Sequence, residues 1–381
     1  MPFAPTPPLP VWLCQQLVRI PSVNPEDNPG TAQTGEAECA NWIADWIRQE
    51  FPGADVSCPE VLPGRPNVIA RFPASRPGKP RLLFAPHTDT VSVAGMTIDP
   101  FSGHLEGGRL WGRGASDTKG PMAAMLAALH NLRGELPLLS HEIWFAGLAG
   151  EEAGQHGAHA LASQETFDLV IAAEPTQLDL VHTHKGSMFL TLTTRGKAVH
   201  AARPHEGTNA LYPMADLLRA VRDDIAPWLA EFEDPVLGHS TISAGTLAGG
   251  SKTNIVPDFC QCTLDLRTLP SQGPDFEQEL YNRFRLVHPE VEIHARKSPP
   301  LWTSLDHPLL DKLQILGALP SGAPWFCDAA VFAQHGTPAI ALGPGSIAQA
   351  HTRDEWIAEE DLIRGADFFS SFLGALREIP T

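Results

Sequence analysis

Short apolar segments alternate with helical segments through the first 175 residues, and this alternation restricts the fold more than any other feature of the sequence. Residues 67–72, 81–86, 142–148 and 169–173 are strand-like, whereas residues 12–20 and 36–51 carry apolar side chains at helical spacing. A further helix is expected from about Pro121, whose missing N–H is tolerated in a first turn. This order is typical of a layered α/β domain, in which helices flank a mixed sheet of mostly parallel strands.

The pattern changes after about residue 180. Residues 188–194 and 260–269 alternate between apolar and polar side chains, and residues 208–225 and 275–287 have helical spacing. This order predicts a small β-α-β-β-α-β unit, a ferredoxin-like α+β sandwich. The first pattern returns with a strand at 338–342 and a closing helix at 359–376. We therefore expect one α/β domain in two parts, residues 1–179 and 297–381, with an α+β domain of residues 180–296 inserted between them.

Polar side chains gather where the predicted strands end. Histidines and carboxylates follow four strands and precede one helix: His87, Asp89, Asp117, Glu151, Glu152, Glu174 and His351. Open α/β sheets place their sites at the carboxyl ends of strands, so these side chains are expected to meet. Taken alone, Asp117 could be no more than the N-cap of the next helix, and the Glu151-Glu152 pair could be no more than part of a solvated surface. Together they indicate a metal site, and nitrogen and oxygen donors without thiolates favour zinc, with cobalt or manganese as substitutes.

Charge and cysteine content limit the class of partner. The 381 residues carry a formal net charge of -17, which disfavours binding to nucleic acid or to an anionic membrane. No run of about 18 apolar residues would span a bilayer, and the first residues lack the basic and apolar regions of an export signal. The six cysteines are scattered, as in a reduced protein of the cytoplasm. We therefore expect a cytoplasmic protein that acts on a small molecule.

Five motifs, in order along the chain, resemble a known family. They are HTDT (87–90), GRGASDTKG (112–120), AGEEAGQHGA (149–158), EPT (174–176) and GPG…AHT (343–352). From roughly residue 13 to residue 376, the chain resembles the dinuclear zinc amidohydrolases that include acetylornithine deacetylase, succinyl-diaminopimelate desuccinylase and glutamate carboxypeptidase. The resemblance implies a catalytic α/β domain, an inserted lid or dimerisation domain, and two Zn²⁺ ions.

The resemblance also implies a role for each residue of the predicted metal site. One ion would be bound by His87, Asp117 and Glu174, and the other by Asp117, Glu152 and His351. Asp117 would thus bridge the two ions, and Glu151 would act as general base toward a water held between them. Asp89 would hold the second ring nitrogen of His87. The peptide bond between Asp117 and Thr118 would be cis.

Further site residues are implied outside this cluster. In the family a histidine of the inserted domain, supplied by the partner subunit, stabilises the oxyanion, and the segment RGKAVHAARPHEGTNAL places this role on His200. The active site would then be complete only in a homodimer. Asn254 and Arg267 match positions of the inserted domain that contact the substrate carboxylate in family members, and Gly345 is a candidate for a backbone contact. A guanidinium group suits a carboxylate, although Arg267 could instead pair with Asp265.

The expected activity is hydrolysis of an amide bond next to a free carboxylate. An N-acyl amino-acid deacylase of the acetylornithine deacetylase or succinyl-diaminopimelate desuccinylase type is the first interpretation, and a carboxypeptidase or dipeptidase that releases a C-terminal amino acid such as glutamate is the alternative. A non-catalytic ligand-binding relative is disfavoured because all five ligands and Glu151 are present. The glycine-rich segments lack the spacing of nucleotide-binding loops, and no G-x-S-x-G segment supports a serine hydrolase.

Overall fold

The chain divides into two compact units. The computed structural model describes residues 7–378, and the outermost residues of the predicted first domain, 1–6 and 379–381, lie outside this range. The first unit comprises the residues up to 182, residues 303–321 and the residues from 327 onward. The second unit comprises residues 183–302 together with a short later segment, 322–326, which no feature of the sequence assigned to it. Within the described range, no helix is long and apolar enough to cross a membrane.

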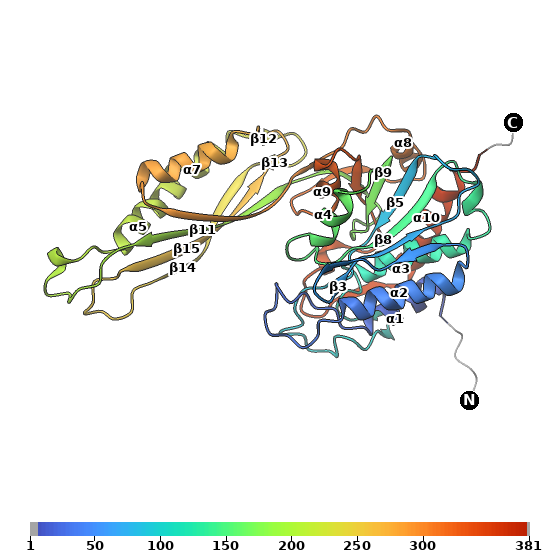
Figure 1. Ribbon diagram of the computed structural model, residues 1–381, viewed down its shortest axis with the longest axis horizontal. Helices are drawn as coiled ribbons and strands as arrows, with labels where there is room; N and C mark the ends of the chain where they lie inside the picture. Colours follow the sequence, from blue (N-terminus) through green and yellow to red (C-terminus); the bar gives the residue numbers. More distant parts are fainter. Residues whose placement is uncertain (1–6, 379–381) are drawn as a thin grey trace. The chain divides into compact units, whose positions relative to one another are not determined.

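A mixed sheet forms the centre of the first unit (Figure 1). Its strands lie in the order β1 (Asp55–Ser57), β4 (Val68–Arg71), β8 (Glu142–Gly147), β5 (Arg81–Ala85), β9 (Leu169–Ala172), β19 (Ala339–Ala341) and β10 (Leu180–His184), with β18 (Pro320–Ala323) beside β10. The last two residues of β10, Thr183 and His184, belong to the second unit, where they pair with β17 (Leu301–Trp302). The four central strands β8, β5, β9 and β19 are parallel, and the outer strands are antiparallel. Every residue of β9 is buried, as expected for a strand covered on both faces. The predicted α/β class is confirmed.

Helices cover the sheet of the first unit. The helices α1 (Leu9–Val18), α2 (Glu36–Glu50), α3 (Lys119–Asn131), α8 (Pro308–Ile315) and α10 (Glu359–Gly374) share one apolar core with the strands. Elsewhere, α4 (His156–Ala162) packs on α9 (Ala329–Gln334), which contacts β9 and β19. Helix α3 begins two residues before Pro121, so the proline occupies the first turn as predicted. Short strands complete the unit: β2 (Glu60–Leu62) pairs with β3 (Arg65–Pro66), and β20 (Trp356–Ala358), β7 (Arg109–Trp111) and β6 (His104–Glu106) form a small sheet.

The second unit is a four-stranded antiparallel sheet with helices packed against it (Figure 1). The strand order is β14 (Thr241–Gly249), β15 (Phe259–Thr268), β11 (Gly186–Arg195) and β16 (Glu292–Ser298), and the helices are α5 (Leu211–Ala220) and α7 (Phe276–Val287). Every second residue of β15, from Cys260 to Leu266, is buried against these helices. This is the predicted β-α-β-β-α-β sandwich. Helix α5 continues through a π-helical turn into α6 (Ala226–Leu229), followed by the hairpin of β12 (Glu233–Asp234) and β13 (Gly238–His239).

Strand β14 has no counterpart among the predicted ranges. Eight of its nine residues are exposed, so its sequence, TISAGTLAG, shows no alternation of apolar and polar side chains. In the described residues it pairs on one side only, with β15, and the pairing shifts between Ala244 and Thr246. A solvent-exposed edge strand of small residues therefore carries no periodic signal that the sequence could reveal.

Candidate metal centre

The five predicted metal ligands come together in the first unit. The two groups of possible ligands are His87, Asp117 and Glu174, and Asp117, Glu152 and His351, and within each group the ligand atoms lie within 4.8 Å of one another. Asp117 belongs to both groups, because its Oδ1 is 3.0 Å from His87 Nε2 and its Oδ2 is 3.3 Å from His351 Nε2. His351 Nε2 is also 3.1 Å from Glu152 Oε2. Asp117 thus lies between two groups of donors.

The ends of the parallel strands position these side chains. His87 follows β5 by two residues and forms a bridge with Leu148, which directly follows β8. Glu174 follows β9 by two residues, and the hydroxyl of Thr118 donates to the carbonyl of Ala173 beside it. The peptide bond between Asp117 and Thr118 is cis, as the resemblance implied. Because the central strands are parallel, their carboxyl ends lie at one edge of the sheet, where sites of this architecture form.

A buried glutamate that sequence reasoning missed holds the loop before Asp117. The carboxylate of Glu355 accepts hydrogen bonds from the backbone N–H groups of Gly114, Ser116 and Asp117 at 2.7–3.0 Å. It also accepts one from Arg113 Nη1 at 2.8 Å. Four donors therefore saturate this carboxylate, which fixes the backbone that carries Asp117. The sequence signal was weak, since Glu355 follows His351 in an otherwise polar stretch.

The loop with Glu151 and Glu152 is held in a similar way. Asp89 Oδ1 accepts the N–H of Glu151, and Asp89 Oδ2 accepts the N–H of Glu152, both at 3.0 Å. Asn24 Nδ2 also donates to Asp89 Oδ2 at 2.7 Å. His87 Nδ1 lies 2.9 Å from the backbone oxygen of Asp89 and 3.4 Å from its carboxylate. Asp89 therefore contacts His87 mainly through its carbonyl, while its carboxylate holds the two glutamates.

The carboxyl groups of the centre are buried and crowd one another. Burial raises the pKa of Glu152 to about 7, and the negative charge of Asp117 adds to this shift. Burial also raises the pKa values of Glu151 and Glu174 well above their usual range. Hydrogen bonds with Asp117 and then Glu152 raise the pKa of His351 to about 11. The carboxyl groups of the centre therefore tend to keep their protons, because several negative charges would otherwise lie close together. Divalent cations bound there would neutralise these charges.

The donor set fits a divalent metal of the zinc type. Imidazole nitrogens and carboxylate oxygens suit zinc, and also cobalt or manganese. Glu152 Oε1 is buried and has no hydrogen-bond partner among residues 7–378, as expected of an atom reserved for a ligand. None of the six cysteines, all of them in the described residues, belongs to either donor group.

Another carboxylate, which sequence reasoning missed, is buried in the first unit. Asp328 directly precedes α9, and its charge interacts with those of His87, Asp89 and Glu152. Its Oδ1 accepts a hydrogen bond from Gln155 Nε2 at 3.3 Å, and burial raises its pKa to about 7. In the sequence, an aspartate immediately before a helix indicates only an N-cap, so nothing distinguished it.

Gly345 packs directly against the loop that carries Asp117. Its φ is +86°, a conformation that favours glycine. A Cβ atom at this position would lie 2.9 Å from Ser116 Oγ and 3.0 Å from the side chain of Ile357. The structure therefore places the backbone of Gly345 beside the residue that precedes Asp117.

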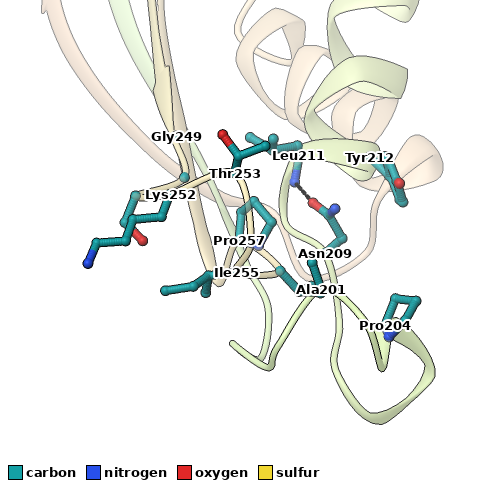
Figure 2. Close-up of a pocket in the computed structure, with 13 residues that line it drawn as sticks. Ala201, Pro204, Asn209, Leu211, Tyr212, Gly249, Lys252, Thr253, Ile255 and Pro257 are labelled. Atoms are coloured by element: carbon teal, nitrogen blue, oxygen red, sulfur yellow. Dashed lines mark hydrogen bonds between the residues drawn. The ribbon is translucent and has the colours of Figure 1, made fainter.

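His200, Asn254 and Arg267 lie in the second unit. His200 forms a bridge with Ile255, and the N–H of Ala201 donates to the carbonyl of Asn254 at 3.0 Å, so His200 and Asn254 are exposed neighbours. Figure 2 shows Ala201 and Ile255 in the lining of a cavity of about 750 Å³ in this unit. Arg267 lies near the opposite end of β15 from the loop that holds Asn254.

Arg267 makes the ion pair that the sequence left open as an alternative. Its Nε is 3.0 Å from Asp265 Oδ1, and its Nη2 is 3.0 Å from Asp265 Oδ2. The guanidinium carbon lies 5.7 Å from the centre of the Phe189 ring and 5.8 Å from that of Phe326. The guanidinium group is therefore held by one carboxylate and two aromatic rings.

Comparisons with known proteins agree with this arrangement. The family described as peptidase family M20/M25/M40 matches residues 83–375. Acetylornithine deacetylase of Proteus mirabilis (strain HI4320) is 28% identical over 363 residues, which cover 91% of both chains. The enzyme of the same name from Aliivibrio fischeri (strain MJ11) is 29% identical over 361 residues, which cover 90% of this chain and 92% of the relative.

A solved structure shares the fold over nearly the whole chain. An M20 family metallo-carboxypeptidase from Sulfolobus solfataricus superposes with a TM-score of 0.78 at 19% identity, covering 96% of this chain and 98% of the other. This likeness agrees with a catalytic α/β unit that carries an inserted sandwich. The chain is a hydrolytic enzyme that belongs to peptidase family M20/M25/M40.

Proposed function

We propose that this enzyme hydrolyses the amide bond of an N-acyl amino acid, next to the free carboxylate of the substrate, with two divalent ions bound at the metal centre. The observation that carries the proposal is that two donor groups share Asp117, and that the buried carboxyl group of Glu151 interacts electrostatically with His87 and Glu174 of one group. Two ions about 3.5–4 Å apart need a shared negative ligand, because they would otherwise repel each other strongly.

Each ion has its own set of ligands in this proposal. His87, Asp117 and Glu174 would hold one ion, and Asp117, Glu152 and His351 the other. When bound, zinc supplies Lewis acidity that polarises the scissile carbonyl and acidifies a coordinated water. The contact of Asp89 with Nδ1 of His87 keeps the Nε2 atom of this ring turned toward Asp117.

Glu151 would move the proton. It takes a proton from the attacking water as the water oxygen bonds to the carbonyl carbon, and it delivers this proton to the amide nitrogen as the C–N bond breaks. The products are a carboxylic acid and an amine, which ionise to a carboxylate and an ammonium ion, so no further reactant is needed. Burial supports this role, because it raises the pKa of Glu151 and so makes its carboxylate a better base.

The residues predicted to bind the substrate keep their roles in this proposal. His200 of one subunit would donate to the oxyanion formed in its partner, and Asn254, Arg267 and Gly345 would contact the substrate carboxylate. Arg267 would then share its guanidinium group between this carboxylate and Asp265. The exposed edge strand β14 supports a homodimer, because an unpaired edge offers backbone groups to a second copy.

Deacylation is the preferred form of this activity. The two relatives named acetylornithine deacetylase align with this chain over nine-tenths or more of both sequences. Release of a C-terminal amino acid, such as glutamate, from a dipeptide is the alternative, and the shared fold with a metallo-carboxypeptidase supports it. The chemistry at the reacting bond is the same, and the two activities differ in which side of the amide the enzyme selects.

A substrate panel tests the proposal. Zinc-loaded protein would be assayed, with and without a chelator, against N-acetylornithine, N-acetylcitrulline, N-succinyl-diaminopimelate, N-acetylmethionine and dipeptides that end in glutamate. We expect chelator-sensitive release of an acyl group from at least one N-acyl amino acid. A preference for the dipeptides would favour the carboxypeptidase alternative, and no hydrolysis of any compound by metal-loaded protein would overturn the proposal.

A further inference from the structure

A buried ion pair, Glu36 with Arg65, lies behind the loop that carries Glu151 and Glu152. We infer that this pair positions the general base, by fixing the backbone of Gly150 immediately before it. The inference rests on the role proposed for Glu151 and concerns residues outside the two donor groups. It predicts a contribution to turnover from two side chains that do not touch the substrate or the ions.

Glu36 binds the loop directly. It is the first residue of α2, its side chain is 1% exposed, and its Oε1 accepts the N–H of Gly150 at 3.0 Å. Its Oε2 accepts a short hydrogen bond from Arg65 Nε, and Arg65 Nη2 lies 3.5 Å from its Oε1. One carboxylate therefore joins the start of α2, strand β3 and the loop after β8.

Arg65 lies against the backbone of the same glycine. Gly150 has a φ of +78°, and a Cβ atom on it would be 3.0 Å from Arg65 Nη2 and 3.3 Å from the ring of His156. The carbonyl of Gly150 accepts the N–H of Gln155 at 2.7 Å, which closes the loop. Both backbone polar groups of Gly150 are thus bound, and a side chain at this position would crowd the guanidinium group of Arg65.

Three consecutive amides are held by two buried carboxylates. The N–H of Gly150 donates to Glu36, and the N–H groups of Glu151 and Glu152 donate to Asp89. Glu151 and Glu152 therefore project from a backbone segment with little freedom. A general base must stay within hydrogen-bond reach of the proton that it transfers, so this constraint bears on the rate of the chemical step.

The charges explain why an arginine is present. Burial raises the pKa of Glu36 to about 7, the negative charge of Asp89 adds to this shift, and the hydrogen bond from Arg65 opposes it. A buried ion pair contributes little net stability compared with apolar residues of the same size. The pair is better explained by orientation, because the guanidinium group of Arg65 contacts both carboxylate oxygens and leaves Oε1 directed at the N–H of Gly150.

The outer end of the network provides a matched control. Arg65 Nη1 also pairs with Glu26 Oε1 at 2.7 Å, and the side chain of Glu26 is 43% exposed. Its other side-chain partner is His156 Nε2, at 3.0 Å. Glu26 thus contacts the same guanidinium group as Glu36, but its carboxylate does not bind the backbone of Gly150. Removing the charge of Glu26 therefore removes an ion pair of Arg65 and leaves the hydrogen bond between Glu36 and Gly150 in place.

The variants Glu36→Gln and Glu26→Gln test the inference. In Glu36→Gln the amide nitrogen would face a donor of Arg65, so we expect kcat to fall about 10–100-fold, as small misplacements of catalytic groups do. KM should change by less than about twofold, and the metal content should stay at the wild-type value. Glu26→Gln should keep both kinetic constants within about twofold. Arg65→Lys keeps the charge but loses the fork of donors, and its kcat should lie between these values.

Hydrogen exchange gives a readout that does not depend on activity. We expect the peptide that contains residues 148–155 to exchange faster in Glu36→Gln than in the wild type or in Glu26→Gln. Wild-type exchange in this peptide and wild-type kcat in Glu36→Gln would overturn the inference, as would equal effects of Glu26→Gln. If Glu36→Gln does not fold, the same comparison applies to Arg65→Lys. If the wild-type enzyme hydrolysed no compound of the substrate panel, the proposed function would be refuted. The hydrogen-exchange data would still test whether Glu36 fixes the backbone of the loop.

Discussion

Replacement of Glu355 by glutamine should destabilise the first unit by about 3–5 kcal/mol, the cost of removing one partner from a buried ion pair. The wild-type carboxylate accepts a hydrogen bond from Arg113 and three from the N–H groups of Gly114, Ser116 and Asp117. Glutamine keeps one oxygen for two of these donors and turns an NH₂ group toward the other two. The side chain of Arg113 is 3% exposed, so its charge would stay buried without this counter-ion.

Urea unfolding, followed by tryptophan fluorescence, measures this loss. Metal-free protein should be used, so that weaker metal binding does not add to the difference in the free energy of unfolding. The matched control is Glu106→Gln, whose side chain is 82% exposed in the wild type and which should change the free energy by less than about 0.5 kcal/mol. A loss below about 1 kcal/mol in Glu355→Gln would show that other contacts hold the loop before Asp117, and it would refute the role assigned to Glu355.

Three further predictions concern the centre and its proposed partner residue. Glu151→Gln should lower kcat by about 10²–10⁴-fold while elemental analysis finds the wild-type metal content, since this side chain belongs to neither donor group. His351→Ala should reduce the metal content from two ions to about one per chain at limiting metal, since this imidazole belongs to only one donor group. Equal metal loss in Glu151→Gln and His351→Ala would contradict the separate roles of general base and metal ligand. His200→Ala should lower turnover without changing metal content or the mass measured in solution, and full activity in this variant would assign the oxyanion donor elsewhere.

The sequence predicted which side chains would come together, because parallel strands bring their carboxyl ends to one edge of the sheet. His87 and Glu174 follow the buried strands β5 and β9, and in each case the change from an apolar run to a charged residue was visible in the sequence. The same reasoning located the sandwich of the second unit through β15, which alternates between buried and partly exposed residues. It could not locate β14, because that strand lies at an edge and buries neither face.

The contacts that support the ligands were beyond the reach of the sequence. Glu355 and Asp117 are 238 residues apart, and Glu36 and Gly150 are 114 residues apart. A glutamate at the start of α2 indicates only a favourable interaction with the helix dipole, and nothing local shows that its carboxylate reaches another loop. For Arg267 the sequence left two partners open, and the structure shows the ion pair with Asp265.

The buried carboxylates of the first unit differ in how they are compensated, and this difference separates two kinds of role. Glu36 and Glu355 each have an arginine beside them, Arg65 and Arg113, and each accepts backbone N–H groups. Glu152 has no arginine contact among residues 7–378, and one of its oxygens has no hydrogen-bond partner in that range. A carboxylate that only fixes the backbone can be fully neutralised by the protein. A carboxylate that binds a metal ion must keep an unpaired oxygen, and the other oxygen of Glu152 faces the imidazole of His351 rather than an arginine. By this criterion Glu36 and Glu355 fix the backbone, and Glu152 fits the role of metal ligand proposed for it.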